Sequence, residues 1–196
     1  MSDASDEELM RRVGNGDRLA YGDLVRRHLG RAVALGQRIS GSRGDGEEIA
    51  QEAFLRVWIK APNWRSGATS GSGSPGTARF STWLYRVIVN LCIDRKRRPA
   101  HAPLEAAGDI PDPAERADDL MARSELSARV AAAVGDLPDR QRAALALCFY
   151  QGLSNREAAE ILSLTPGAVE SLLVRARRGL RQSLADAAAE FLEVGT

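Results

Sequence analysis

Hydrophobic residues recur every three to four positions along most of this 196-residue chain, the spacing that places them on one face of an α-helix. The clearest case is segment 80–99, FSTWLYRVIVNLCIDRKRRP, in which Ser81 can begin a helix and Pro99 ends it. Its predicted buried stripe is Trp83, Leu84, Val87, Ile88, Leu91 and Cys92. A second set of side chains indicates a surface that meets nucleic acid: Tyr85, Arg86, Asn90 and Arg97. A packed helix with a solvated basic end explains this segment equally well.

Three further helices are predicted upstream of this segment. Ser5 and Glu8 have capping-box spacing, and Asp17 can cap a longer helix that runs towards Ile39. Asp45 is expected to start the third helix, after a turn over residues 41–44.

The third helix has two different faces. Its predicted buried stripe is Ile49, Ala53, Phe54, Val57 and Trp58. The other face carries acids, an amide, an arginine and one leucine, namely Glu48, Gln51, Glu52, Leu55 and Arg56. An exposed leucine among polar residues indicates a protein contact, although single exposed leucines are also common on ordinary surfaces.

Two segments lack helical periodicity. Residues 63–78 form a Gly/Ser-rich stretch, which predicts a flexible loop. Residues 103–125 contain seven acids against two arginines, with several prolines, which predicts a flexible acidic linker. We therefore expect an all-α protein of two small helical domains, residues 1–98 and 123–196, joined by a linker over 99–122.

The second domain ends in a short helix, a tight turn and a longer helix. Ser154 and Glu157 make a second capping box, while Thr165 caps the last helix and Pro166 occupies its first position. This arrangement predicts a helix-turn-helix, whose last helix enters the major groove of DNA. Its outward residues are predicted to be Gly167, Ser171, Val174, Arg175 and Arg178.

Charge supports a polyanionic ligand, whereas nothing in the sequence supports catalysis. The formal net charge is only +1, yet residues 86–98 and 175–181 are each strongly basic and flank the acidic linker. Cys92 and Cys148 are expected to be buried free thiols, and His28 a helix-surface residue. No metal-ligand spacing or catalytic motif is present, so we expect no enzyme, metal or cofactor. No apolar run approaches the roughly 20 residues that cross a bilayer, so we expect a cytoplasmic protein without membrane contact.

Three motifs in this order resemble the extracytoplasmic-function (ECF) sigma factors, small subunits that direct bacterial RNA polymerase to promoters. They are DGEEIAQEAFLRVW, FSTWLYRVIVNLCIDRKRR and LPDRQRAALALCFYQGLSNREAAEILSLTPGAVESLLVRARRGLR. The resemblance implies that core RNA polymerase and promoter DNA are partners, and that an anti-sigma factor holds the protein inactive until a stress signal. It implies no obligate homo-oligomer.

The resemblance also assigns roles to the residues above. Polymerase binding falls on Glu48, Gln51, Glu52, Leu55 and Arg56, with Trp58 mainly in the core. Recognition and melting of the −10 element fall on Tyr85, Arg86, Asn90 and Arg97. Recognition of the −35 element falls on Gly167, Glu170, Ser171, Val174, Arg175 and Arg178. Glu170 and Leu172 stand where many relatives carry basic residues, and we expect Glu170 to alter the −35 preference.

Three other interpretations remain open at this level. A helix-turn-helix regulator that acts without polymerase explains only the C-terminal segment. A nucleic-acid-processing enzyme would need an acid–base or metal cluster that the sequence lacks. A helical adaptor would treat the basic patches as solvated faces.

Overall fold

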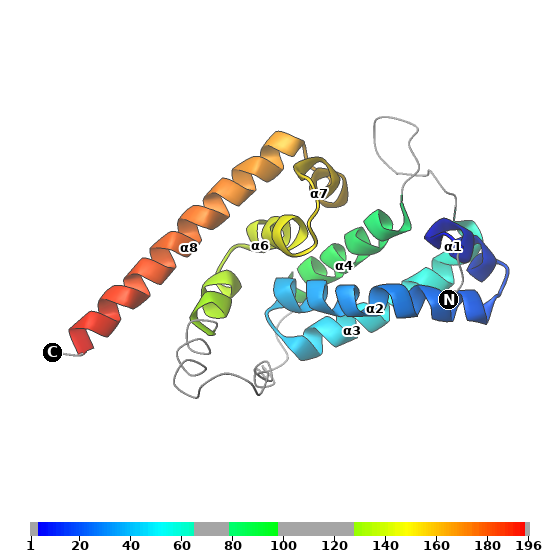
Figure 1. The fold of residues 1–196 in the computed structure, drawn as a ribbon, viewed down its shortest axis with the longest axis horizontal. Coiled ribbons are helices and arrows are strands. Elements are labelled where there is room, and N and C mark those ends of the chain that lie inside the picture. The colour runs from blue at the N-terminus through cyan, green and yellow to red at the C-terminus, as the bar shows by residue number, and fades with distance from the viewer. Residues whose placement is uncertain (1–3, 65–78, 98–127, 195–196) are drawn as a thin grey trace.

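The computed structural model describes residues 4–64, 79–97 and 128–194, and within these ranges it is helical and contains no strand. The all-α prediction is therefore confirmed. Helices α1, α2 and α3 gather at one end of the molecule, α8 lies at the other, and α4 runs between them (Figure 1). The elements are α1 (Asp6–Gly14), α2 (Arg18–Ser40), α3 (Arg43–Lys60), a short 3-10 turn (Ala61–Asn63), α4 (Phe80–Arg97), a helix over 128–135, α6 (Asp139–Leu145), a π-helical turn (Ala146–Tyr150), α7 (Asn155–Leu162) and α8 (Pro166–Val194).

Local capping explains where the N-terminal helices begin. The Ser5 hydroxyl accepts a hydrogen bond from the Glu8 amide, and the Asp17 carboxylate accepts from two amides in the first turn of α2. The predicted start of α3 is wrong by two residues. Ser42 caps this helix by accepting from the Asp45 amide, so the last residues assigned to a turn are already helical.

Helices α2 and α3 pack with their backbones in direct contact at two glycines. A Cβ built on Gly36 would lie 3.0 Å from the Cα of Gly46, and a Cβ built on Gly46 would lie 2.6 Å from the Gln37 backbone nitrogen. Neither position can hold a larger side chain without moving a helix. This close approach positions the outer face of α3, on which the polar residues lie.

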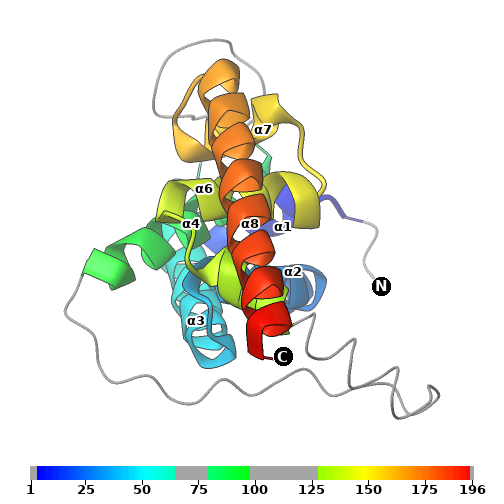
Figure 2. The ribbon, with the colours of Figure 1, turned by 90° about the vertical axis from the view of Figure 1, so that its left-hand side faces the viewer.

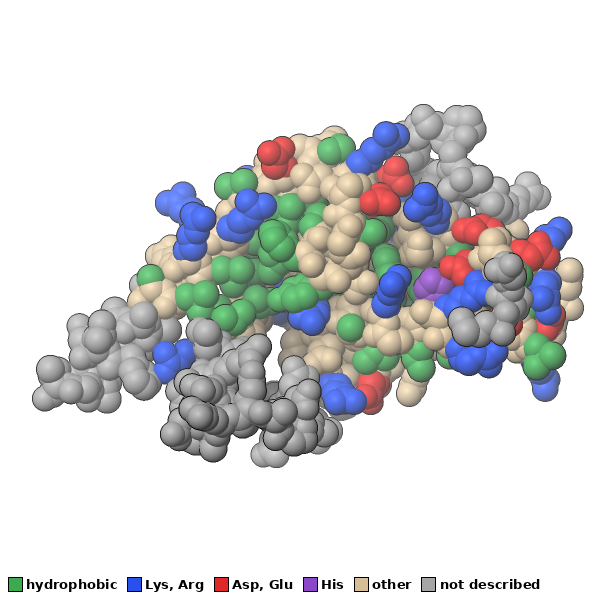
Figure 3. All heavy atoms as spheres, in the orientation of Figure 1, with side chains coloured by type: hydrophobic (Ala, Val, Ile, Leu, Met, Phe, Trp, Pro, Cys, Tyr) green, Lys and Arg blue, Asp and Glu red, His purple; other side chains and the backbone are tan. Residues whose placement is uncertain are grey.

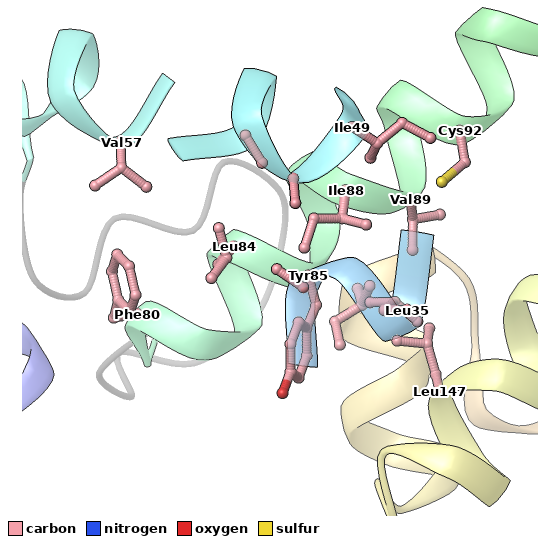
Figure 4. Packing of buried hydrophobic residues seen from close by; sticks show 14 of the residues in the cluster. Leu35, Ile49, Val57, Phe80, Leu84, Tyr85, Ile88, Val89, Cys92 and Leu147 are labelled. Atoms are coloured by element: carbon pink, nitrogen blue, oxygen red, sulfur yellow. The ribbon is translucent and has the colours of Figure 1, made fainter. Parts of the chain in front are cut away.

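Helix α4 is buried on two sides, whereas the sequence predicted a single stripe. Figure 4 shows Ile49 and Val57 of α3 on one side of α4, and Leu35 of α2 with Leu147 of the π-helical turn on the other. The second side adds two residues outside the predicted stripe, Tyr85 and Val89, to the core. The predicted members Leu84, Ile88 and Cys92 are buried, and Trp83, Val87 and Leu91 are half-buried.

The C-terminal half contains the predicted helix-turn-helix. Ser154 and Glu157 form the complete reciprocal capping box at the start of α7. Ser163 ends this helix in a left-handed conformation with φ 54°, and the Thr165 hydroxyl accepts from the Ala168 amide at the start of α8. Both caps lie where the sequence placed them.

Arg142 is a buried charge that sequence reasoning missed. Only 2% of its surface is exposed, and its guanidinium donates to the Gly135 carbonyl at 2.6 Å and to the Asp139 carboxylate at 2.6 Å. These bonds connect the end of helix 128–135 to the start of α6. A cation at a helix C-terminus is also favoured by the helix dipole.

The two halves of the chain share one hydrophobic core. Most buried residues of the N-terminal helices and of α6, the π-helical turn, α7 and α8 belong to one continuous cluster, while Leu137, Leu145 and Ala176 form a second, small one. Figure 2 views the molecule from the end at which α8 lies, and α8 is seen in front of the N-terminal helices. The Gly/Ser-rich segment 65–78 and the acidic linker lie outside the described residues, so the domain limits stay a prediction.

Candidate functional site

A groove with a volume of about 600 Å³ lies between the outer face of α3 and the end of α4. Leu55 is 51% exposed at its edge, and Glu52 pairs with Arg56 at 3.0 Å along α3. Ile49 and Leu91 contribute apolar surface. The groove thus combines acidic, amide and apolar groups. Such a lining suits a partner helix that carries both polar and apolar side chains. It is lined by Glu48, Ile49, Gln51, Glu52, Leu55, Arg56, Leu91, Asp94 and Arg95.

All five residues predicted to bind a protein through α3 therefore lie together in this groove. Arg95 is an addition that sequence reasoning missed, because it was grouped with the basic end of α4. Its guanidinium pairs with Glu48 at 2.7 Å and with Asp45 at 2.9 Å. The hydrogen bond to Glu48 is the main cause that raises the pKa of Arg95 above its ordinary value. No local spacing signals this pairing, because the partners lie on different helices.

Trp58 differs from its predicted core position. It is 36% exposed, and its ring lies edge-on to the ring of Tyr21 with a centroid distance of 5.3 Å. The Tyr21 hydroxyl donates to the Phe54 carbonyl at 3.2 Å, which holds this pair against the side of α3. The indole therefore lies at the margin of the core, because Tyr21 covers only one part of it.

The four residues predicted to face DNA from α4 do not form one exposed row. Tyr85 is only 5% exposed, and its hydroxyl donates to the Gln151 side chain at 3.2 Å. Arg86 is half-buried and donates to the Glu160 carbonyl. Asn90 is exposed as predicted, and the Arg97 side chain lies outside the described residues.

The physical reason for this correction is tertiary packing. Gln151 and Glu160 belong to the C-terminal half, which lies against the second side of α4. Burial raises the pKa of the Tyr85 hydroxyl above its ordinary value. A helical period can show that a tyrosine lies off the main stripe, but it cannot show that another domain covers that side.

An aromatic cluster lies where the chain enters and leaves segment 65–78. The rings of Trp64 and Trp83 are 5.3 Å apart in an edge-on arrangement, and both lie near Phe80. His28, predicted on a helix surface, is instead buried against Phe80 and contacts the Asp6 carboxylate through Nε2 at 2.7 Å. The face of the imidazole ring packs in the core against Phe80, and the Asp6 carboxylate provides a hydrogen-bond partner for Nε2.

The outward face of α8 agrees with its prediction throughout. All five residues predicted to face outward are exposed, as is Glu170, and the Ser171 hydroxyl donates to the Gly167 carbonyl at 2.9 Å. Basic side chains gather over α8 on the face seen in Figure 3. Such a helix can place small and polar groups against base edges while its arginines contact phosphates. The six residues are Gly167, Glu170, Ser171, Val174, Arg175 and Arg178.

Both cysteines are free thiols. Cys92 is buried, and burial raises the pKa of its thiol to about 12. Cys148 is only half-buried, in contrast to its prediction. Across residues 4–64, 79–97 and 128–194 there is no cluster of three metal-ligating side chains. No helix within these ranges is long and apolar enough to cross a membrane.

Comparison with known proteins identifies the two halves separately. Residues 24–101 match the family model described as Sigma-70 region 2, and residues 127–180 match that described as Sigma-70, region 4. The first match includes α3, α4 and most of α2, and the second includes α7 and the first half of α8.

Several relatives match most of this chain. The ECF RNA polymerase sigma factor SigE of Mycolicibacterium smegmatis is 36% identical over 175 residues, which cover 87% of this chain and 64% of that protein. SigW of Bacillus subtilis, another ECF sigma factor, is 31% identical over 194 residues, which cover 90% of this chain and 95% of that protein. The solved structure of CnrH in complex with the cytosolic domain of CnrY is 30% identical, has a TM-score of 0.64, and is matched over 94% of this chain and 99% of that chain. The chain therefore belongs to the family of ECF RNA polymerase sigma factors.

Proposed function

We propose that this protein is an alternative sigma factor that binds core RNA polymerase and directs promoter-specific transcription initiation through −10 and −35 recognition. One observation carries this proposal. A single chain holds both sigma-70 regions, and each region presents an exposed surface of different chemistry. One is the groove of α3 and α4, and the other is the outward face of α8.

Polymerase docking is assigned to the groove. Leu55 offers an apolar anchor, and Glu48 and Glu52 surround it with carboxylates that suit a basic helix. Arg95 pairs with Glu48 and Arg56 pairs with Glu52, so Asp94 leaves the groove lining with an excess of negative charge. A partner that brings its own arginines or lysines would gain charge complementarity at the rim, which speeds association.

Recognition of the −35 element is assigned to α8. Arg175 and Arg178 are exposed one turn apart and suit phosphate contacts, while Gly167 and Ser171 leave the N-terminal turns accessible to base edges. Glu170 is exposed on the same face, and its carboxylate can accept from the N4 amine of a cytosine.

Recognition of the −10 element is assigned to α4. Asn90 is exposed, and Tyr85 and Arg86 would become accessible once the C-terminal half moves away. The aromatic cluster around Trp83 suits the stacking of unpaired bases, which contributes about 1–3 kcal/mol per base. Unstacking costs a few kcal/mol per base, so stacking of this size offsets it.

An inhibitory partner completes the proposal. The related CnrH was solved as a complex with the cytosolic domain of a second protein, and we expect this sigma factor to be held by an anti-sigma factor in a comparable way. Bond formation belongs to the polymerase, so the protein itself needs no catalytic group, cofactor or homo-oligomer. Its place of action is the cytoplasm, with the polymerase.

The test is run-off transcription with purified core polymerase, together with a measurement of core affinity. Leu55→Asp should weaken core binding at least about tenfold, because the apolar anchor becomes a further carboxylate beside Glu48 and Glu52. Leu19→Asp is the matched control, since Leu19 is 80% exposed on α2 and does not line the groove. Promoter-specific transcripts with the wild type, lost only with Leu55→Asp, would support the proposal. Operator binding without any polymerase-dependent transcript would contradict it.

A further inference from the structure

Helix α1 precedes both of the residue ranges that match the sigma-70 family models, and the function proposed above gives it no role. We propose that Glu7 of this helix is a positioning residue for opening of the −10 element. Its carboxylate fixes the start of α4 and, with it, the aromatic cluster of Trp64, Phe80 and Trp83. This inference rests on the −10 function proposed above for α4.

The residue directly before α4 cannot cap this helix. It is Arg79, whose side chain offers hydrogen-bond donors but no acceptor. The first amides of a helix have no carbonyl partner within the helix, so they need an acceptor from elsewhere. Here the Glu7 carboxylate accepts from the Phe80 amide at 3.1 Å, across 73 positions of the chain. A charged acceptor makes a stronger hydrogen bond than a neutral one, and the helix dipole favours a negative charge at this end.

A second acid of α1 fixes the ring of the same phenylalanine. Phe80 is fully buried at the start of α4 (Figure 4), and its ring lies edge-on to the ring of His28 with a centroid distance of 5.2 Å. His28 in turn lies with Nε2 2.7 Å from the Asp6 carboxylate, and Arg27 of α2 pairs with that carboxylate at 2.9 Å. Asp6 and Glu7 thus act on the ring and on the backbone amide of one residue.

The other end of α1 contacts the chain just before the aromatic cluster. A Cβ built on Gly14, the last residue of α1, would lie 2.6 Å from the Ala61 carbonyl oxygen, so the two backbones are in direct contact. The same oxygen accepts from the Trp64 amide at 3.0 Å. Helix α1 therefore contacts the chain on both sides of segment 65–78, at Ala61 through Gly14 and at Phe80 through Glu7.

The aromatic rings are close enough for a shift of Phe80 to move the others. Its ring centroid lies 6.2 Å from that of Trp83 and 6.3 Å from that of Trp64. Trp83 is only half-buried, so part of its ring remains accessible to a base. Stacking offsets the cost of unstacking most fully when the rings are already in place, because ordering them during binding costs free energy. Loss of the Glu7 contact should therefore slow strand opening.

The two other proposed surfaces are distant from this contact. The groove residues on α4 are Leu91, Asp94 and Arg95, and the first of them lies about three turns beyond Phe80. The −35 face lies on α8. Core binding and initial promoter binding should therefore depend little on Glu7.

The test compares the full-length wild type with Glu7→Ala, which removes the acceptor, and Glu7→Gln, which keeps a carbonyl oxygen at the same reach. The matched control is Glu8→Ala, because Glu8 is the neighbouring acid of α1 and pairs with Arg11 of the same helix. Each protein is assembled with core polymerase on a promoter duplex that the wild type transcribes, with 2-aminopurine in the −10 element. Fluorescence at several polymerase concentrations separates the initial binding constant from the rate of strand opening.

Glu7→Ala should open the duplex about tenfold more slowly, the factor for about 1.4 kcal/mol, with initial binding within about twofold of the wild type. Glu7→Gln should open it within about threefold of the wild-type rate, and Glu8→Ala should match the wild type. A merely structural role would lower core affinity and initial binding together with the rate. Wild-type opening by Glu7→Ala, or an equal loss of initial binding, would overturn the proposal. Opening by Glu7→Gln as slow as that by Glu7→Ala would also overturn it, because the bond to the amide would not then be responsible.

Amide hydrogen exchange of the free protein, followed by NMR, judges the contact without polymerase. The Phe80 amide should exchange at least about tenfold faster in Glu7→Ala than in the wild type, while amides further along α4 stay protected. An unchanged Phe80 rate would overturn the proposal whatever the transcription result. A wild type that opens no promoter with core polymerase contradicts the proposed function itself, and a Phe80 amide still protected by Glu7 would show that a lost contact is not the cause.

Discussion

Replacing Gly46 with alanine should destabilise the N-terminal half, although alanine is the better helix former. A Cβ at this position would lie 2.6 Å from the Gln37 backbone nitrogen and 2.8 Å from the Val33 carbonyl oxygen. Both atoms belong to the backbone of α2, so no side chain can rotate away to make room. Helices α2 and α3 would have to separate, and the buried contacts on either side of Gly46 would loosen.

The magnitude depends on two opposing effects. Overpacking a tight contact costs up to about 3 kcal/mol. The change from glycine to alanine within a helix returns about 1 kcal/mol. We therefore expect Gly46→Ala to lower the free energy of unfolding by about 2 kcal/mol. Gly30→Ala is the matched control, because Gly30 is exposed in α2 and a Cβ there meets nothing within 4 Å. It should raise stability by about 1 kcal/mol.

Urea unfolding followed by tryptophan fluorescence measures both variants. The chain has three tryptophans, Trp58, Trp64 and Trp83, and all of them lie in the N-terminal half. With a slope of about 2 kcal/mol/M, the midpoint should fall by about 1 M for Gly46→Ala and rise by about 0.5 M for Gly30→Ala. A midpoint for Gly46→Ala at or above the wild-type value would refute the reasoning, since the backbones could not then be in contact as described.

Three further predictions concern single side chains. Iodoacetamide at about pH 8 should modify Cys148 well before Cys92, because burial raises the pKa of Cys92 to about 12 and hides its sulfur; equal alkylation rates by mass spectrometry would contradict this. The hydrogen bond from the Ala20 amide lowers the pKa of Asp17 in the folded protein. The ionised Asp17 therefore stabilises the fold above about pH 4, and this stabilisation is lost as the pH falls through the lowered pKa. Asp17→Asn keeps the cap but loses this dependence, so thermal melts between about pH 6 and 3 should fall less steeply than in the wild type, and parallel curves would count against it. Glu170→Lys should steepen the salt dependence of DNA binding by about one phosphate contact and change the ranking of −35 sequences, and an unchanged ranking in a binding panel would end that idea.

Features set by neighbours along the chain could be predicted from the sequence. The caps at Ser5, Asp17, Ser154 and Thr165 each depend on amides two or three residues away, and all four are observed. The start of α3 at Arg43 was missed by two residues, because the Ser42 cap lies between two nearby glycines, which is typical of a turn.

The outward faces of α3 and α8 were equally accessible to sequence reasoning. Residues three or four positions apart share a helix face wherever the helix lies. Once α3 and α8 are helices, the five predicted polymerase-binding residues and the predicted −35 residues must lie away from the apolar stripes of those helices.

The side-chain environments that only the tertiary structure decided depend on partners far apart in the chain. The burial of Tyr85 depends on Gln151, the pairing of Arg95 depends on Glu48, and the burial of His28 depends on Phe80. Helical periodicity ranks the sides of one helix by polarity, but it carries no information about which other helix will cover them. For this reason the amino-acid sequence was sufficient to identify the helices, most of their ends and two of the candidate binding surfaces. Only the packing of the two halves showed that Tyr85 and Arg86 of the third surface are covered.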